Sequence, residues 1–498
     1  MPVPTWGVSV PAKMNSRKEI IDFFQKEGIL IQPDAIEFLV ANGNGINSCR
    51  TLLNEMGERP FIISSEDIKH VFEKIGEKKE RAATGSRMNR VGGRKTIKKE
   101  GFRILQDVTG NSTCQGELGD FVMLFRDRFE KLGALIRKRQ EMRNALPLRR
   151  VMHRDDEITT IGMVKDVIPA KNGVVVELED SEASITAYIP KDVDPLLVVD
   201  EVIGISGKKR GDMVTVKSVV RPELPRERRK NVADEEKYVL FLSDLHVGSK
   251  SFLEKEWLRF IEWMQGKRGT EKQRDLVKKV SHIIICGDVV EGIGIYPGQE
   301  NDLLVDDIYL QYEELARKLS AIPEEIAIIM QPGNHDAVRP SLPQPSFGNE
   351  ITSMFEGRDV TFIGNPCYLE IDGVTILAYH GQSLQDFATS LPDMSQNRPA
   401  KIMKEMLKRR HMAPIYGGIA SLAPERKDYL IIDRVPDIFV TGHVHVTAVD
   451  SYRDVILINA SAWQAQTEYQ RMMDFMPDPA KAVLVNLKDL SPSLIQFS

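Results

Sequence analysis

The chain has 498 residues, of which 42% are hydrophobic and 28% are charged, and its formal net charge at pH 7 is −5. This length is too great for one hydrophobic core, so we expect several domains. The acidic balance excludes a uniformly basic nucleic-acid-binding protein, so any contact with nucleic acid must be local. The four cysteines have neither zinc-ribbon nor disulfide spacing, which favours a reducing compartment.

The amino-terminal residues resemble no targeting signal. Met1-Pro2-Val3-Pro4-Thr5-Trp6 lacks the basic start and apolar centre of a signal peptide. No apolar run approaches the roughly 20 residues that a membrane-spanning helix needs. We therefore expect a cytoplasmic protein without membrane contact.

Residues 1–76 predict a small helical domain that serves interactions rather than catalysis. Ser16-Arg17-Lys18-Glu19 has the form of a capping box, and apolar residues at helical spacing follow it. Similar patterns indicate helices from Pro33, over about 48–56, and after Ser64. Each of these helices is short.

Residues 77–100 predict a flexible basic linker. The apolar period is lost there, and nine lysines or arginines stand against three acids. We favour a solvated tether over a dedicated DNA-binding arm for this segment.

Residues 101–222 predict an OB-fold β-barrel with a flanking helix. A strand is expected over 102–108 and a helix over 119–143. Short alternating segments then predict five strands, with a longer connection before the fourth. The strands are expected over 159–167, 174–179, 184–189, 201–208 and 213–220. The only aromatic residue in them is Tyr188, so we favour a packing or partner-binding barrel over one that binds single strands by base stacking.

Residues 237–498 predict a layered α/β domain, in which helices over 253–265 and 303–319 separate apolar strands. Five short apolar runs each end in a turn that contains Asp, Asn or His. Five of the nine histidines lie in these turns. If the runs pair in sheets, their carboxyl ends form one rim, where ligand sites of such proteins lie. The turns contain Asp244 and His246, then Asp288, then Asn334, His335 and Asp336, then His380, and finally His443 and His445.

This inventory suits a metal site. Imidazole and carboxylate ligands together select Zn, Mn or Fe rather than calcium, and the residues do not distinguish among the three. A single Asp-x-His or Gly-Asp sequence is common in ordinary turns. Five such turns in order, each after an apolar run, are not explained by ordinary turn composition.

The ordered set resembles the calcineurin-like metallophosphoesterase superfamily, which includes phosphatases and a DNA-repair nuclease. The resemblance implies that two divalent metal ions share the bridging residue Asp288. It implies Asp244, His246, Asp288 and His445 for the first ion, and Asp288, Asn334, His380 and His443 for the second. His335 is then a general acid or transition-state stabiliser, and Asp336 orients its ring.

Two further segments resemble a narrower family, the small subunits of the archaeal family-D DNA polymerases. They are Asp107-Val108-Thr109-Gly110-Asn111-Ser112 and the segment from Ala460-Ser461-Ala462-Trp463 to Tyr469. The resemblance implies a 3′-to-5′ proofreading exonuclease in a heterodimer whose large subunit polymerises DNA. DNA ends are then the substrate.

A basic stretch after His380 is a candidate DNA contact, and it contains Lys401, Lys404, Lys408, Arg409, Arg410 and His411. Trp463 and Tyr469 are candidate anchors for the partner subunit, with core packing of Trp463 as the alternative.

Two other functions of the protein remain open. One is a phosphatase or small-molecule phosphodiesterase, and the other is a structural subunit with a silent site.

Overall fold

The computed structural model describes residues 101–498 except 195, 473 and 474, and eleven residues of the preceding segment. The eleven are residues 20, 23, 24, 30, 31, 35, 36, 39, 62, 63 and 68. The chain divides into two compact units, Met1–Ile97 and Lys98–Ser498.

In the first unit, strands β1 (Leu30–Ile31) and β2 (Ile62–Ile63) pair in parallel. Phe24, Ala35 and Ile68 are helical and buried. The predicted helix over 48–56 and the predicted linker over 77–100 lie outside the described residues.

Two six-stranded sheets form the centre of the second unit. The first has the order β12-β11-β10-β9-β18-β19, and the second has the order β16-β17-β15-β14-β13-β3. The first sheet consists of β9 (Tyr238–Leu242), β10 (Val280–Cys286), β11 (Ala327–Gln331), β12 (Val360–Phe362), β18 (Lys481–Asn486) and β19 (Pro492–Gln496). The second consists of β3 (Phe102–Gln106), β13 (Cys367–Ile371), β14 (Val374–Ala378), β15 (Ile438–Thr441), β16 (Ala448–Tyr452) and β17 (Val455–Asn459).

Alternation along the strands explains how these sheets pack. In β9, Val239 and Phe241 face a core that also contains Ile376 and Val440 of the second sheet. Leu240, on the opposite face of the strand, packs among the helices of the first sheet. A strand that is buried on both faces is continuously apolar, as the sequence of β9 is.

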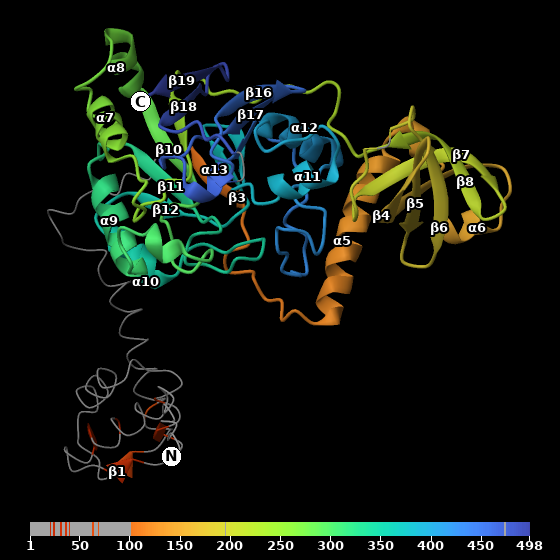
Figure 1. Ribbon diagram of the computed structural model, residues 1–498, viewed down its shortest axis with the longest axis horizontal. Helices are drawn as coiled ribbons and strands as arrows, with labels where there is room; N and C mark the ends of the chain where they lie inside the picture. The colour runs from red at the N-terminus through yellow and green to blue at the C-terminus, as the bar shows by residue number, and fades with distance from the viewer. Residues whose placement is uncertain are drawn as a thin grey trace, which may run out of the picture. The chain divides into compact units, whose positions relative to one another are not determined.

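Helices cover the outer faces of the sheets, which gives four layers. Trp257 of α7 and Tyr312 of α9 pack in the core on the first sheet, whereas Phe387 of α11 and Met406 of α12 pack on the second. Figure 1 shows α7 to α10 along one side of the molecule, and α11 and α12 beside β16 and β17. The helices are α7 (Glu254–Met264), α8 (Glu271–Val277), α9 (Ile308–Ser320), α10 (Asn349–Thr352), α11 (Leu384–Ser390), α12 (Pro399–Arg409) and α13 (Glu468–Met472). Short 3₁₀ turns lie at Gln140–Met142, Gln299–Asn301 and Ser353–Phe355.

Helix α9 begins five residues later than predicted. Asp307 caps it, because its side chain accepts hydrogen bonds from the main-chain N–H groups of Tyr309 and Leu310. The apolar residues before Asp307 fit the helical period but lie in a loop, where Leu304 is 70% exposed.

Strand β3 lies in the segment expected to belong to the barrel domain over 101–222, but it is part of the second sheet. It pairs antiparallel with β13, and Arg103 forms an ion pair with Glu370 across the two strands. The segment before the barrel therefore completes the second sheet. The sequence shows the strand but not its distant partner.

The barrel itself is closed and five-stranded, with the order β4-β5-β6-β8-β7. All five predicted strands are present, as β4 (Glu157–Ala170), β5 (Gly173–Glu179), β6 (Ser184–Pro190), β7 (Val202–Arg210) and β8 (Met213–Val220). Helix α5 (Leu118–Arg137) packs Leu132 and Ile136 against Ile161 and Val202 of the barrel, and α6 (Leu148–Met152) adds Val151 to its core.

Candidate metal centre

Five strands bring their carboxyl ends to the candidate site. β9, β10 and β11 are parallel neighbours in the first sheet, and β14 and β15 are parallel neighbours in the second. Each of these strands is followed within four residues by one or more of the predicted ligands. The two sheets face each other, so the ends of both sets of strands meet at one rim.

The first group of side chains contains Asp244, His246 and His445, all of which are buried. The Nε2 atoms of the two histidines lie 3.1 Å apart. His445 Nε2 lies 3.4 Å from Asp244 Oδ1, and His246 Nε2 lies 4.0 Å from Asp288 Oδ2. Three nitrogen and oxygen ligand atoms thus converge on one point.

The second group contains Asp288, His380 and His443. His380 Nε2 lies 3.2 Å from Asp288 Oδ2 and 3.1 Å from Asn334 Oδ1. The rings of His380 and His443 meet edge to face, with centroids 5.1 Å apart. Asp288 is therefore close to ligand atoms of both groups.

The backbone at these residues is strained. Asp244, His246, Asp288, His443 and His445 all have positive φ angles, between 49° and 70°. Non-glycine residues seldom adopt this region, and such strain gathers at functional sites.

Two glycines give the carboxylates room. A Cβ on Gly333 would overlap the carboxylate of Asp288, and a Cβ on Gly442 would lie 2.5 Å from Asp244 Oδ2. Glycine is required at both positions by this close approach, whatever its conformational freedom.

The residues fit a metal ion on two counts. The donor set mixes imidazole nitrogens with carboxylate and amide oxygens, which suits a divalent transition metal. In addition, His443 Nδ1 is a buried nitrogen without a hydrogen-bond partner among the described residues. A buried polar atom without a hydrogen-bond partner is unfavourable unless it binds a ligand such as a metal ion.

The charges of the site shift several pKa values. Burial alone would lower the pKa of His380, but the charge of Asp288 raises it to about 9. Burial and the neighbouring His380 lower the pKa of His443 to about 3. Burial would raise the pKa of Asp244, but His445 lowers it to about 2. The lowered pKa of Asp244 favours its ionised form, which is the form that binds a metal ion.

His335 lies against the site but outside both groups. Its main-chain N–H donates to Asp288 Oδ1 at 2.8 Å, and its ring packs edge to face on His246 at 4.7 Å. Its Nδ1 donates to the carbonyl oxygen of Glu291 at 2.7 Å. This contact leaves Nε2 as the ring nitrogen free to exchange a proton.

The structure corrects the expected role of Asp336. Its carboxylate accepts hydrogen bonds from Gly333 N at 2.8 Å and from the Tyr312 hydroxyl at 3.2 Å. Burial and the charge of Asp288 raise the pKa of Asp336 to about 7. Asp336 therefore shapes the turn that carries Asn334 and His335, whereas the carbonyl of Glu291 orients the His335 ring.

Sequence reasoning missed Glu291. Its carboxylate is buried, and Oε2 lies 3.0 Å from His246 Nδ1. Glu291 follows Asp288 by three residues in the same turn, after the apolar residues Val289 and Val290. This acidic residue so close to a predicted ligand was the only sequence feature that could have indicated its role.

Comparison with known proteins places the chain in a family. The DNA polymerase II small subunit of Archaeoglobus fulgidus is 40% identical over 468 residues, which cover 93% of this chain and 94% of the relative. The protein of the same name from Methanothermobacter thermautotrophicus is 37% identical, over 96% of this chain and all of the relative. The chain belongs to the family of DNA polymerase II small subunits.

Two further matches cover parts of this family member. The family of DNA polymerase alpha/epsilon B subunits matches residues 239–448. Among solved structures, one reported as a novel archaeal phosphodiesterase covers 52% of the chain, with 98% of its own length, 14% identity and a TM-score of 0.25.

The basic stretch of this small subunit is largely internal, which corrects the expected DNA contact at three residues. Arg409 and Arg410 are buried, and so is His411. Arg409 forms ion pairs with Glu201 of the barrel at 3.0 Å and with Glu405 at 2.5 Å. Buried and paired cations cannot contact a DNA backbone without breaking these bonds.

The remaining partners of the stretch are also protein groups. Arg410 donates to the carbonyl oxygens of Ile432 and Asp433, and His411 Nε2 lies 2.8 Å from Asp428 Oδ2. Lys404 pairs with Asp450 and Lys408 pairs with Glu405. Lys401 is exposed and donates to the carbonyl of Asp393.

Trp463 is a core residue, which corrects its assignment as a partner anchor. It is fully buried, and its ring lies 5.2 Å from the rings of both Trp257 and Phe260. Its main-chain N–H donates to the carbonyl of Asp244 at 2.9 Å. The side chain of Tyr469 lies outside the described structure.

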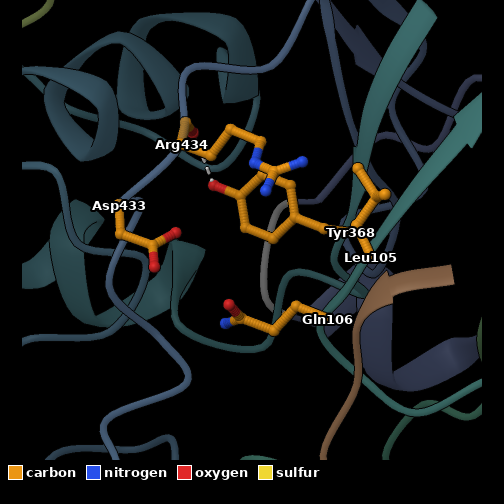
Figure 2. A pocket seen from close by; sticks show the side chains of 5 residues that line it. All are labelled: Leu105, Gln106, Tyr368, Asp433 and Arg434. Carbon is orange, nitrogen blue, oxygen red and sulfur yellow. Dashed lines mark hydrogen bonds between the residues drawn. The ribbon is translucent and has the colours of Figure 1, made fainter. Parts of the chain in front are cut away.

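A separate cavity of about 370 Å³ lies beside β3. Leu105 and Gln106 line it together with Tyr368, Asp433 and Arg434. Figure 2 shows Asp433 and Gln106 around the Tyr368 ring, whose hydroxyl donates to the carbonyl of Arg434. None of the residues that line this cavity belongs to the metal centre.

No helix within the described residues is both long enough and apolar enough to span a membrane.

Proposed function

We propose that this chain is the 3′-to-5′ exonuclease subunit of a heterodimeric DNA polymerase. The observation that carries the proposal is the convergence of two groups of buried ligand atoms at one rim, with Asp288 close to both. A merely structural subunit has no need for this strained and crowded arrangement.

Asp244, His246, Asp288 and His445 hold the first divalent ion, and Asp288, Asn334, His380 and His443 hold the second. Mn, Zn and Fe all suit these ligands. When bound, the pair of ions activates water and stabilises the charge that develops on the phosphate and the leaving oxygen.

His335 protonates the leaving 3′-oxygen from Nε2. The carbonyl of Glu291 accepts from Nδ1, so a second proton can reside only on Nε2. Burial lowers the pKa of His335, which makes its imidazolium a stronger acid. The anionic phosphate of the substrate favours the charged ring before transfer.

The large subunit of the polymerase is the partner, and DNA synthesis belongs to that subunit. The names of the relatives support this assignment, since a small subunit implies a larger one. The five-stranded barrel is of the OB type. Its strand order and the parallel pairing of β6 with β8 support that reading.

A nuclease assay on the full chain tests the proposal. The substrate is a 3′-labelled primer with a terminal mismatch, with and without a large subunit, in Mn²⁺ and after chelation. We expect mononucleotides to be released from the 3′ end only in the presence of metal. Hydrolysis of a small aryl phosphodiester without attack on DNA ends would instead indicate a small-molecule phosphodiesterase. Absence of metal and of both activities would indicate a silent site.

A further inference from the structure

Glu291 is a buried acid that the proposed ligand set does not use. It is 1% exposed, and its carboxylate contacts two side chains from distant parts of the sequence. Glu291 Oε2 lies 3.0 Å from His246 Nδ1, and the same oxygen accepts a hydrogen bond from Gln464 Nε2 at 2.8 Å. The atom thus joins the turn after β10 to the segment after β17.

Gln464 is itself held in place. It is 3% exposed, and its Nε2 also donates to Ser249 Oγ at 2.9 Å. Phe252 and Gln464 form an isolated β-bridge, and Trp463 N donates to the carbonyl of Asp244. The Gln464 side chain is therefore fixed by the packing of its neighbours before it meets Glu291.

We propose that Gln464 and Glu291 form a positioning relay that fixes the ring of His246 for the first metal ion. The inference rests on the proposed function, because it assigns His246 as a ligand of that ion. The carboxylate of Glu291, 3.0 Å from Nδ1, favours the tautomer whose proton is on Nδ1, which leaves the lone pair of the ring on Nε2. Nε2 is the atom that points toward His445 and Asp288.

The chemistry of metal sites supports this reading. Histidine ligands donate their second ring N–H to a carboxylate or carbonyl, which sets the tautomer and raises the basicity of the metal-binding nitrogen. Glu291 supplies the carboxylate, and Gln464 holds that carboxylate in line. The buried glutamine amide also offsets part of the desolvation of the acid.

Glu291 links the relay to His335 as well. Its carbonyl oxygen accepts from His335 Nδ1 at 2.7 Å and from Gln299 Nε2 at 3.0 Å. The side chain of one residue thus orients His246 and its main chain orients His335. A substitution of the side chain removes the first function and leaves the second.

Titration of the metal-free full chain with Mn²⁺, followed by electron paramagnetic resonance and calorimetry, tests the relay. Glu291→Ala and Gln464→Leu remove its two members. Gln466→Leu is the matched control, because Gln466 lies in the same segment and donates to the carbonyl of Phe475 instead. Glu291→Gln keeps an acceptor and tests rescue. Melting temperatures show that each variant is folded.

We expect Glu291→Ala and Gln464→Leu to weaken one of the two Mn²⁺ sites by roughly 10–100-fold, while the other site stays within a factor of a few. Glu291→Gln should recover part of the loss, and Gln466→Leu should match the wild type. The wild type also provides the test of the underlying function, since two Mn²⁺ ions should bind.

Two outcomes separate the relay from the function on which it rests. If the wild type binds two ions and both relay variants bind them equally well, the relay is wrong and the metal centre stands. Equal weakening by Gln466→Leu would also overturn the relay, because it would show general disturbance of the segment. If the wild type binds no Mn²⁺, both proposals fail.

Discussion

Asp288 connects the two groups of side chains, and its replacement is the sharpest test at the scale of a residue. Asp288→Ala should abolish nuclease activity, because the bridging carboxylate serves both ions. The chain should stay folded, since the neighbouring strands remain buried. Nuclease rate, metal content and circular dichroism are measured together. Near-normal hydrolysis by this variant would contradict the two-metal assignment.

His335→Ala separates a proton donor from a ligand. We expect the variant to keep both metals and to bind DNA, and to lose on the order of 10²–10⁴-fold in turnover, as removal of a positioned acid does. Turnover and metal stoichiometry are compared with those of the wild type. Loss of a metal ion would mean that His335 is a ligand.

At the scale of an element, α12 shows how a basic sequence can be internal. The guanidinium of Arg409 lies between Glu201 of the barrel and Glu405 of the helix itself. Arg409→Ala leaves both buried acids without this partner, which should destabilise the chain by about 3–5 kcal/mol. Chemical denaturation measures the change.

Lys401→Ala is the control for that prediction. Lys401 lies on the same helix and is exposed, so its removal should change the free energy of unfolding by less than about 0.5 kcal/mol. If both variants were equally stable and Arg409→Ala alone lost affinity for DNA, the ion pairs with Glu201 and Glu405 would be dispensable and Arg409 would contact the substrate.

The segment after β17 contains Trp463, whose burial in the core gives a second prediction at this scale. In the free subunit, Trp463→Ala should lower the free energy of unfolding by about 3–5 kcal/mol, because it opens a cavity among Trp257, Phe260 and Phe497. The melting temperature of the subunit alone measures this loss. An unchanged melting temperature with weakened binding of a large subunit would restore the interface assignment.

At the scale of the whole molecule, the amino-terminal unit is separable from the site. Every proposed ligand lies in the unit Lys98–Ser498. Removal of residues 1–97 should therefore leave a folded, metal-binding nuclease that is altered only in assembly or recruitment. The cut keeps β3, because its pairing with β13 completes the second sheet. Aggregation or loss of metal by this variant would contradict the separation.

The sequence by itself determined the strands of the barrel, the five apolar strands that lead into the site and the residues at the carboxyl ends of those five. These features are local, since buried strands are continuous apolar runs and the turns that follow them are polar. His246, His380 and His445 could therefore be named before their neighbours were known.

Only the tertiary structure decided which polar residues are buried and which residues they interact with. Arg409 and Arg410 read as surface cations, but partners far away in the sequence neutralise or bind them. The sequence around Trp463 was compatible with a partner anchor and with a core residue. The contact of its ring with Trp257 of α7 shows that it is a core residue. The carboxylate of Glu291 accepts a hydrogen bond from Gln464, which is 173 residues away in the sequence. Burial and pairing depend on segments that the chain brings together only when it folds, and no local pattern records them.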